Sequence, residues 1–399
     1  MSAKVPKGIF IVAAKRTPFG SMLGTLKGLT PTDLGVIATN AALQQAKLDP
    51  ALIDDCIFGN VSQTAQDTAY LARHVGLRAG MRKEIPALTL NRLCGSGFES
   101  ILTGAKNISI GESGIVACGG AENMSMAPYA LRDIRTGTKF PNDLKMEDTL
   151  WSALNDQLIK MPMALTAEKL GEQFGITREQ CDEYALRSQH AWQKAQDAGL
   201  FASEIAPVTI EGKKGSIVFG VDEHPRGGKA TMESMTKLKS IFKKDGLVTA
   251  ANASGISDGA GMIIIASEKA VKQHNLTPLA RLVGYSSAGV DPTIMGHGPV
   301  PAINNALKAS GLQKSDLGLV EINEAFAAQY LACEKDLGLD RDICNLNGGA
   351  IAMGHPTGCS GSRIMAHLTY EMARKNIKYG VGSACCGGGQ GVAIILEKC

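Results

Sequence analysis

Four short stretches contain the residue types that nucleophilic and acid–base catalysis requires. They are CGSG at 94–97, NEAF at 323–326, GHPTGCSG at 354–361 and CCGGGQG at 385–391. Each lies near the carboxyl end of a predicted strand. A cysteine at the first turn of a helix is a candidate nucleophile, because the helix N-terminus lowers the pKa of a thiol and presents N–H groups beside it.

Each stretch also has an ordinary structural explanation. Cys94 could fill core space, because a free cysteine packs as a small hydrophobic residue. Asn323 could cap a helix, and His355 could be a turn residue before proline. Cys385 or Cys386 could belong to the core. No single stretch decides between the two explanations.

The elements that must position these residues follow from hydrophobic periodicity. Apolar runs of strand length alternate with helix-period segments, which is the pattern of βαβ units on a buried sheet. This pattern predicts an α/β fold. Strands are expected at 9–14, 114–118, 261–266, 318–322, 379–385 and 391–396, and helices at 33–46, 96–108, 300–310, 362–374 and, from a capping box that starts at Thr177, 177–198.

The chain also repeats itself. ALQQAKLDPALIDDCIFGN (42–60) aligns with ALKASGLQKSDLGLVEINE (306–324) at a constant offset of 264. The same offset takes Cys94 to Gly358, inside a second glycine-rich turn that enters a helix. IVACGG, starting at 115, also parallels GSACCGG, starting at 382, once a few residues are inserted. Three blocks in one order indicate a duplicated α/β domain with the active site between the halves.

This duplication divides the chain into three predicted parts and gives the motifs a common location. The parts are an N-terminal half (1–121 with 249–272), an insertion (122–248) and a C-terminal half (273–399). Cys94 and His355 then face each other as a nucleophile and its base. The glycines of GGGQG allow a backbone N–H to approach the same point, which makes an oxyanion hole plausible.

Composition excludes several classes of protein. The chain has 399 residues, 44% of them hydrophobic and 20% charged, and a formal net charge of +3. That charge is too small, and its lysines too scattered, to predict nucleic-acid binding. No apolar run approaches the roughly 18 residues of a membrane span. Ten cysteines without C-x-x-C spacing predict no metal site and a reducing compartment.

The N-terminus is basic, with no acidic residue before Asp33. A mitochondrial presequence has this composition, but the apolar run at 9–14 is expected to remain in the mature fold as a strand. The final Lys-Cys is not a peroxisomal signal of the Ser-Lys-Leu type. Composition therefore leaves the compartment open.

The motifs together resemble those of the thiolase family, in thiolase order and over essentially the whole chain. The matching segments are AKRTPFG (14–20), CGSGF (94–98), GGAENMSMAPY (119–129), NASGISDGA (252–260), NEAFA (323–327), NGGAIAMGHPTGCSGSR (347–363) and GSACCGGGQG (382–391). Within the family, the chain looks closest to the mitochondrial 3-ketoacyl-CoA branch. It departs from the common pattern at Thr357, Cys359 and Cys386.

The resemblance implies a five-layered αβαβα fold of two similar halves with an inserted loop domain that binds CoA and makes oligomer contacts. It implies a homodimer or homotetramer. The implied reaction is CoA-dependent cleavage of 3-ketoacyl-CoA to acetyl-CoA and an acyl-CoA two carbons shorter, in fatty-acid β-oxidation. Coenzyme A would be a substrate, with no permanently bound cofactor or metal. The expected location is the mitochondrial matrix, or the cytoplasm if the source is bacterial.

The resemblance also implies roles for individual residues. Cys94 would be acylated, His355 would activate it, and Cys385 would be the second acid/base. Asn323 would hold a water that binds the thioester oxygen with His355, and the N–H groups of Cys94 and Gly387 would form a second oxyanion hole. The residues implied for CoA and substrate binding are Arg226 beside the adenine, Ser254 near the pantetheine, Phe326 in the tunnel, and Met163, Leu238 and Ala325.

Three alternatives remain open. A decarboxylating enzyme of the ketoacyl-synthase type shares the fold but would pair its cysteine with two histidines. A silent lipid-carrier paralogue would not need the complete Cys–Asn–His–Cys set. An acetoacetyl-CoA thiolase working in the condensation direction would use the same residues. Short-chain thiolases commonly have a His-Met pair where this chain has Pro162 and Met163, so we expect a broad-range enzyme.

Overall fold

The computed structural model describes residues 2–4, 8–212 and 215–399. Lys7, which belongs to the basic N-terminal segment, lies outside the described residues. Within them, the main strands form a mixed sheet of eleven strands in the order β15-β16-β17-β14-β2-β13-β6-β4-β5, with β1 (Ser2–Lys4) and β3 (Gly20–Ser21) paired off this path.

The sheet divides into two halves that meet at β14 and β2. The N half contains β2 (Ile9–Arg16), β4 (Asp55–Gly59), β5 (Ala87–Leu90), β6 (Ile115–Asn123) and β13 (Ser257–Ser267). The C half contains β14 (Ala280–Gly289), β15 (Leu319–Ile322), β16 (Tyr379–Cys386) and β17 (Gln390–Lys398). Two residue pairs, Ala280 with Ile11 and Arg281 with Phe10, join the halves.

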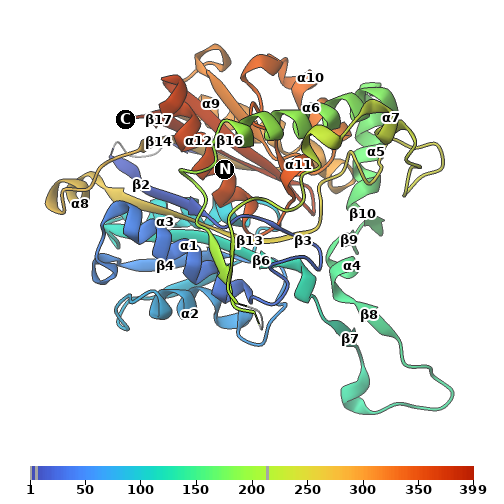
Figure 1. The fold of residues 1–399 in the computed structure, drawn as a ribbon, viewed down its shortest axis with the longest axis horizontal. Coiled ribbons are helices and arrows are strands. Elements are labelled where there is room, and N and C mark those ends of the chain that lie inside the picture. The colour runs from blue at the N-terminus through green and yellow to red at the C-terminus, as the bar shows by residue number, and fades with distance from the viewer. Residues whose placement is uncertain (1, 5–7, 213–214) are drawn as a thin grey trace.

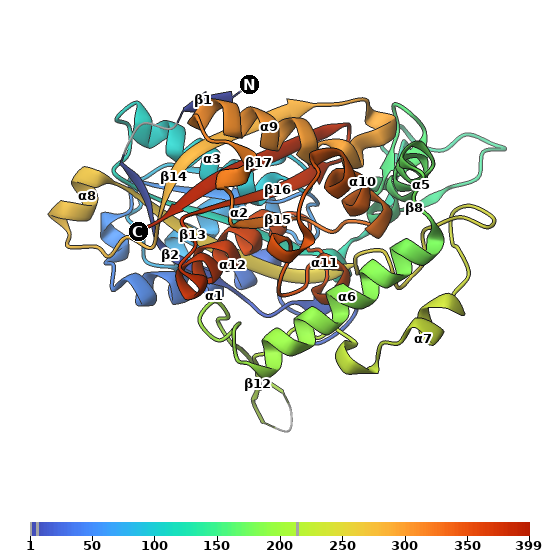
Figure 2. The same ribbon diagram turned by 90° about the horizontal axis from the view of Figure 1, so that it is seen from above.

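Helices cover both outer faces and fill the space between the halves (Figures 1 and 2). The outer face of the N half packs on α1 (Pro31–Ala46) and α2 (Leu71–Arg78). The outer face of the C half packs on α9 (Pro299–Ser310) and α10 (Ala327–Leu337). Between the halves lie α3 (Ser96–Ser109) and α12 (Ser360–Lys375), whose apolar residues form one core with both halves. These are the five layers that the resemblance to thiolases implies.

Strand pairing shows the internal repeat directly. In the N half β4 pairs in parallel with β6, with Asp55 opposite Val116; in the C half β15 pairs with β16, with Leu319 opposite Gly380. Both members of the second pair lie 264 residues after their counterparts. The starts of α3 and α12, at 96 and 360, differ by the same number.

The sequence comparison aligned IVACGG with GSACCGG by assuming that a few extra residues precede the second block. The strand pairing shows no such insertion, so that expectation was wrong. Aligning the similar letters shifts the register by three residues, whereas backbone pairing fixes it at 264. Cys385 consequently corresponds to Ala121 rather than to Cys118. A shift of three also moves a side chain to the opposite face of the strand, because side chains alternate.

All the strands and helices predicted from periodicity are present. The capping box at Thr177 is confirmed: Thr177 and Gln180 bond reciprocally at the start of α6 (Arg178–Asp197). Several elements were not predicted, among them β4, β14, α2, α10 and α5 (Met163–Phe174). The strand expected before Cys94 is β5, whose bounds were not predicted. The bounds of the three predicted parts remain a prediction.

The segment between β6 and β13 leaves the sheet and returns to it at neighbouring positions, because Asn123 pairs with Asp258. Besides α5 and α6, it contains the small elements β7 (Tyr129–Leu131), β8 (Met146–Asp148), α4 (Thr149–Ala153), β9 (Asn155–Asp156), β10 (Met161–Pro162), β11 (Val208–Ile210), β12 (Ile217–Phe219) and α7 (Met232–Thr236). The β7–β8 arm projects away from the body of the molecule (Figure 1).

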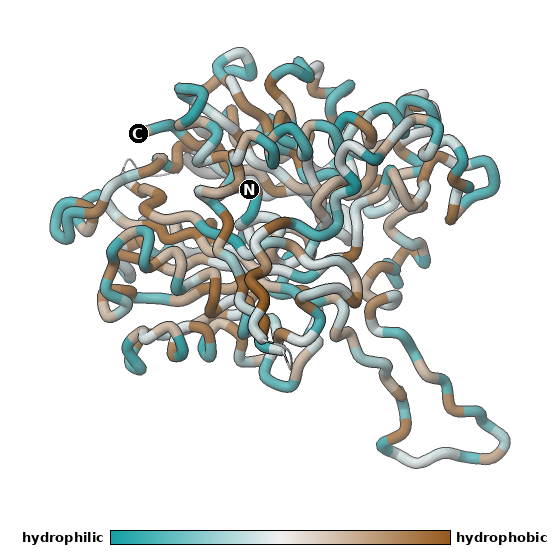
Figure 3. Tube along the Cα trace, viewed as in Figure 1, coloured by the Kyte–Doolittle hydropathy of each residue, from teal (hydrophilic) through white to brown (hydrophobic). Residues whose placement is uncertain are grey.

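Hydropathy follows this layering. The brown, apolar segments of Figure 3 run through the central strands, and teal segments lie mainly at the periphery. Among the described residues, the remaining α-helices are α8 (Glu268–Gln273) and α11 (Ala350–Met353), which precedes the His355 turn. In the part of the chain that the structure describes, no helix has the length and apolar character needed to cross a membrane.

Candidate active site

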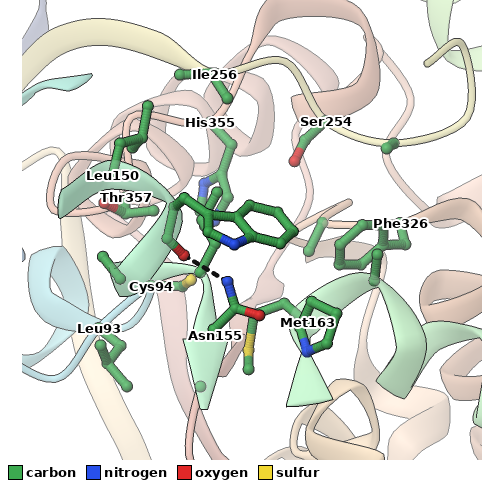
Figure 4. A pocket seen from close by; sticks show the side chains of 18 of the residues that line it. Leu93, Cys94, Leu150, Asn155, Met163, Ser254, Ile256, Phe326, His355 and Thr357 are labelled. Atoms are coloured by element: carbon green, nitrogen blue, oxygen red, sulfur yellow. Dashed lines mark hydrogen bonds between the residues drawn. The ribbon is translucent and has the colours of Figure 1, made fainter. Parts of the chain in front are cut away.

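A cavity of about 520 Å³ lies where the two halves and the insertion meet. All four chemical motifs reach it directly: CGSG through Cys94, NEAF through Ala325 and Phe326, GHPTGCSG through His355 and Thr357, and CCGGGQG through Gly387 and Gly388. Figure 4 shows Cys94 and Thr357 on one side of this cavity, Ser254 and Phe326 on the other, and His355 between them. The motifs that the sequence singled out are thus brought to one place.

Cys94 is presented by a tight turn between β5 and α3. Leu93 adopts a left-handed backbone conformation (φ 51°), which is uncommon for a non-glycine residue. The Ser96 hydroxyl closes the turn, donating to the Leu93 carbonyl at 2.7 Å and accepting from the Arg92 N–H at 2.9 Å. The turn therefore fixes the thiol at the start of α3, where it is only partly covered.

The ionisation of Cys94 differs from the expectation for a helix N-terminus. Burial raises the pKa of the Cys94 thiol to about 11, although backbone N–H groups of Gly387 and of Cys94 itself oppose the change. Burial therefore outweighs the lowering that we expected. The resting group is a neutral thiol, and a base must remove its proton before it can attack.

His355 can be that base. Its Nδ1 lies 2.6 Å from the Ser360 hydroxyl, which donates to the Pro356 carbonyl at 3.1 Å, so Nδ1 carries the proton and donates it to Ser360. The Nε2 lone pair accepts from the Asn323 amide at 3.3 Å. Burial, followed by the nearby Arg363 charge, lowers the pKa of His355 to about 3. The imidazole is neutral, and Nε2 is its acceptor nitrogen.

Asn323 directly follows β15 and is fully buried behind the cavity wall. Its backbone N–H donates to the Ser383 carbonyl at 2.9 Å, which fixes it beside β16. Its side-chain Oδ1 has no hydrogen-bond partner within the described residues. A buried amide oxygen without a donor is costly, so this atom is suited to bind a water or a substrate donor.

Cys385 is also buried, and it packs with Met295, Ala325, Met163 and Phe326, all four of which line the cavity. Burial, and then the proximity of Cys94 and two further thiols, raises the pKa of Cys385. Cys385 is therefore a protonated thiol that can act as an acid. The next residue, Cys386, points to the opposite face of the strand and belongs to the central core.

Comparison with known proteins assigns the family. Residues 9–269 match the thiolase N-terminal domain, and residues 276–398 match the thiolase C-terminal domain. The chain belongs to the thiolase family. It is an acyltransferase.

Relatives of two kinds share this thiolase's full length. The mitochondrial 3-ketoacyl-CoA thiolase of Bos taurus is 59% identical over 392 residues, covering 98% of each chain. The acetyl-CoA acetyltransferase of Paracoccus denitrificans is 44% identical, covering 97% of this chain and 98% of its own. A crystal structure of human mitochondrial 3-ketoacyl-CoA thiolase in complex with CoA matches with a TM-score of 0.97 at 57% identity, covering 100% and 99% of the two chains.

The predicted CoA contacts divide into two groups. Ser254, Phe326, Met163 and Ala325 line the cavity. Arg226 and Leu238 do not; both lie on exposed parts of the insertion, and their roles remain a prediction.

Sequence reasoning missed several residues of this thiolase site. The apolar wall contributed by the insertion was not predicted, and it includes Leu150, Trp151, Leu154, Ile241 and Phe242. Ser360 was also missed, although it stands in the same turn as His355. The spacing of five residues between them was the available signal, but it indicates contact only once the turn is known.

Proposed function

We propose that this thiolase cleaves 3-ketoacyl-CoA with free CoA, releasing acetyl-CoA and an acyl-CoA two carbons shorter. The observation that carries the proposal is a set of reactive groups at one place. A thiol at Cys94 and a neutral imidazole at His355 line the cavity, and a second protonated thiol, Cys385, packs against residues of its wall. The 59% identity to a mitochondrial 3-ketoacyl-CoA thiolase supports it.

In the first half-reaction, His355 Nε2 takes the Cys94 proton and the thiolate attacks the 3-keto carbon. The C2–C3 bond then breaks, leaving the shortened acyl group on Cys94 as a thioester. The departing acetyl-CoA enolate receives a proton from Cys385. An enolate needs fixed donors at its oxygen, which we assign to the now protonated His355 and a water held by Asn323.

In the second half-reaction, free CoA gives its thiol proton to the Cys385 thiolate and attacks the acyl-cysteine. The Cys94 thiolate leaves and regains its proton from His355. The N–H groups of Gly387 and Cys94 bind the oxyanion of the tetrahedral intermediate. Coenzyme A is thus a substrate. Ser254 and Phe326 contact its pantetheine, and Arg226 lies beside its adenine.

The apolar wall of the cavity supports a broad range of acyl chain lengths. Leu150, Trp151, Leu154 and Met163 present aliphatic, aromatic and thioether surface. Each methylene that this surface buries contributes up to about 0.8 kcal/mol of binding. Met163 can adapt to chains of different length, because methionine is flexible and polarisable.

An acetoacetyl-CoA thiolase working in the condensation direction is the second candidate. The identity of 44% to an acetyl-CoA acetyltransferase supports it less strongly than the 59% supports the first. A ketoacyl-synthase mechanism is disfavoured, because the group beside Cys94 and His355 is the Cys385 thiol rather than a second histidine. A silent carrier is disfavoured by the complete set of reactive groups.

We also propose a mitochondrial location in fatty-acid β-oxidation, by analogy with the named relatives. A homodimer or a homotetramer is proposed as the assembly. The projecting arm supports intersubunit contacts, because it exposes large apolar side chains, including Phe140 at 99% and Met146 at 69%.

The test is thiolysis of 3-ketoacyl-CoA substrates of four to sixteen carbons, measured as kcat/KM. We expect cleavage of acetoacetyl-CoA and equal or faster cleavage of medium-chain substrates. A steep decrease beyond four carbons would favour the acetoacetyl-CoA assignment. Absence of thiolysis with every substrate would refute the proposed function.

A further inference from the structure

Glu122, next to the end of β6, is a buried carboxylate beside the cavity that has no place in the mechanism above. It is fully buried, and its two oxygens accept hydrogen bonds from five neutral donors. Three belong to the segment after β4: the backbone N–H groups of Val61 and Ser62, both at 3.0 Å, and the Asn60 amide at 3.2 Å. The other two are the Thr357 hydroxyl at 3.0 Å and the Gly358 N–H at 2.9 Å.

The two bonded segments come from opposite halves, and both form the cavity wall. Val61 and Ser62 line the cavity from the N half, and Thr357 lines it from the C half. Thr357 stands two residues after His355. The carboxylate therefore connects the turn that carries His355 to the half that carries Cys94.

The two backbones that Glu122 connects are in close contact. A Cβ atom placed on Gly120 would clash with the Gly358 carbonyl, and one placed on Gly358 would lie 2.8 Å from Glu122 Oε2 and 2.9 Å from the Gly59 carbonyl. Glycine is therefore required at both positions for the two backbones to approach. The carboxylate therefore lies at a close approach between the two halves.

We propose that Glu122 is a positioning residue of the thiolase reaction, whose carboxylate holds the His355 turn at a fixed distance from Cys94 by accepting hydrogen bonds from both halves. The inference rests on the roles that the proposed function gives to Cys94 and His355. Placement errors of about 1 Å in a reacting group can reduce turnover by about 100-fold.

The charge of Glu122 also acts on Cys94, and this gives the proposal a second readout. Its proximity contributes to the raised pKa of the Cys94 thiol. The other titratable groups that face Cys94 are His355, Cys385 and Cys386, which burial keeps uncharged at neutral pH. Glu122 itself has a pKa that burial raises to about 7.

Two substitutions test the hydrogen-bond geometry and the charge of the Glu122 side chain separately. Glu122→Gln keeps the length but places an NH2 group against N–H donors, and it removes the charge. Glu122→Asp keeps the charge but is one methylene too short to reach both segments. We expect kcat to decrease by about 100-fold in both variants. The KM for CoA should change little, because Ser254 and Phe326 are not bonded to Glu122.

Alkylation of Cys94 by iodoacetamide from pH 6 to 12, measured by peptide mass spectrometry, reports the effect of the Glu122 charge on the Cys94 thiol without any acyl-CoA. The exposed Cys399 serves as an internal reference. We expect Glu122→Gln to shift the Cys94 profile to lower pH and Glu122→Asp to leave it unchanged. Because this assay uses no substrate, it remains informative even if the proposed thiolysis is not observed.

Glu168→Gln is the matched control. Glu168 is also buried and accepts from the backbone N–H groups of Leu247 and Val248, but it does not line the cavity. The control should lose thermal stability comparably while keeping kcat and the Cys94 profile. Wild-type kcat in both Glu122 variants, or losses of kcat that merely follow thermal stability in all three proteins, would overturn the proposal.

Discussion

Replacing Ser360 with alanine tests how His355 is kept in the form that can accept a proton. The buried Ser360 hydroxyl accepts from His355 Nδ1 at 2.6 Å and donates to the Pro356 carbonyl at 3.1 Å. Alanine removes both bonds and leaves the Nδ1–H without this acceptor. The alternative tautomer, with its proton on Nε2, then gains population, and it cannot accept the Cys94 proton.

The magnitude follows from the cost of a buried donor without a partner, which is about 1–3 kcal/mol. Since each 1.36 kcal/mol changes a rate tenfold, kcat should decrease roughly 5- to 150-fold. The KM for CoA should stay close to that of the wild type, because Ser360 does not line the cavity.

The assay is steady-state thiolysis with Ser362→Ala as the matched control. Ser362 is also buried on α12, but its hydroxyl faces the Gly97 carbonyl at 3.5 Å rather than His355. Thermal unfolding of both variants shows whether either loses its fold. If Ser360→Ala turns over as fast as Ser362→Ala, the reasoning about the tautomer is refuted.

Three further predictions concern the proposed catalytic groups. Cys94→Ala should abolish the covalent acyl-enzyme in intact-mass spectra, and an acyl group on another residue would contradict the assignment. Cys385→Ser should block turnover while acyl-CoA still acylates Cys94, whereas Cys386→Ala, a change in the central core, should retain turnover; the reverse outcome would show that the two cysteines are misassigned. The folded-state pKa of His355, near 3, lies below its ordinary value of 6.5, so the unfolded chain binds more protons between these values and stability falls as pH falls through that window. Between pH 6.5 and pH 5, the free energy of unfolding of the wild type should therefore decrease by about 2 kcal/mol more than that of His355→Gln, measured by urea unfolding. Equal decreases in the two proteins would contradict a neutral buried imidazole.

The main elements of this fold could be predicted from periodicity, since buried strands such as 261–266 are continuous apolar runs. The exceptions have a physical cause. In β14 the sequence ARLVGYSSAG alternates buried and half-buried residues but contains glycine and serine, which resemble a turn. The strand β5 has only four residues, none of them fully buried, and it lies at the edge of the sheet.

At the site, the reactive side chains could be predicted and their surroundings could not. Cys94 and His355 stand in glycine-rich turns related by the repeat. Glu122 lies inside a matching motif, yet its partners include backbone N–H groups far away in sequence, at 61, 62 and 358. The raised pKa of Cys94 results from burial at the junction of the halves, which no local pattern reports.

The long excursion between β6 and β13 has a consequence for biosynthesis. Both strands that pair with β2 lie later in the chain than the insertion, and β13 is also the partner of one edge of β6. The N half therefore lacks β13, the strand that lies between β2 and β6, while the ribosome makes the more than 130 residues from Asn123 to Ser257. At about 5–20 residues per second, this takes roughly 7 to 27 seconds. During that time the apolar edges of Ile9–Arg16 and Ile115–Asn123 lack their partner strand, so the nascent chain is a natural client for chaperones that bind exposed strands.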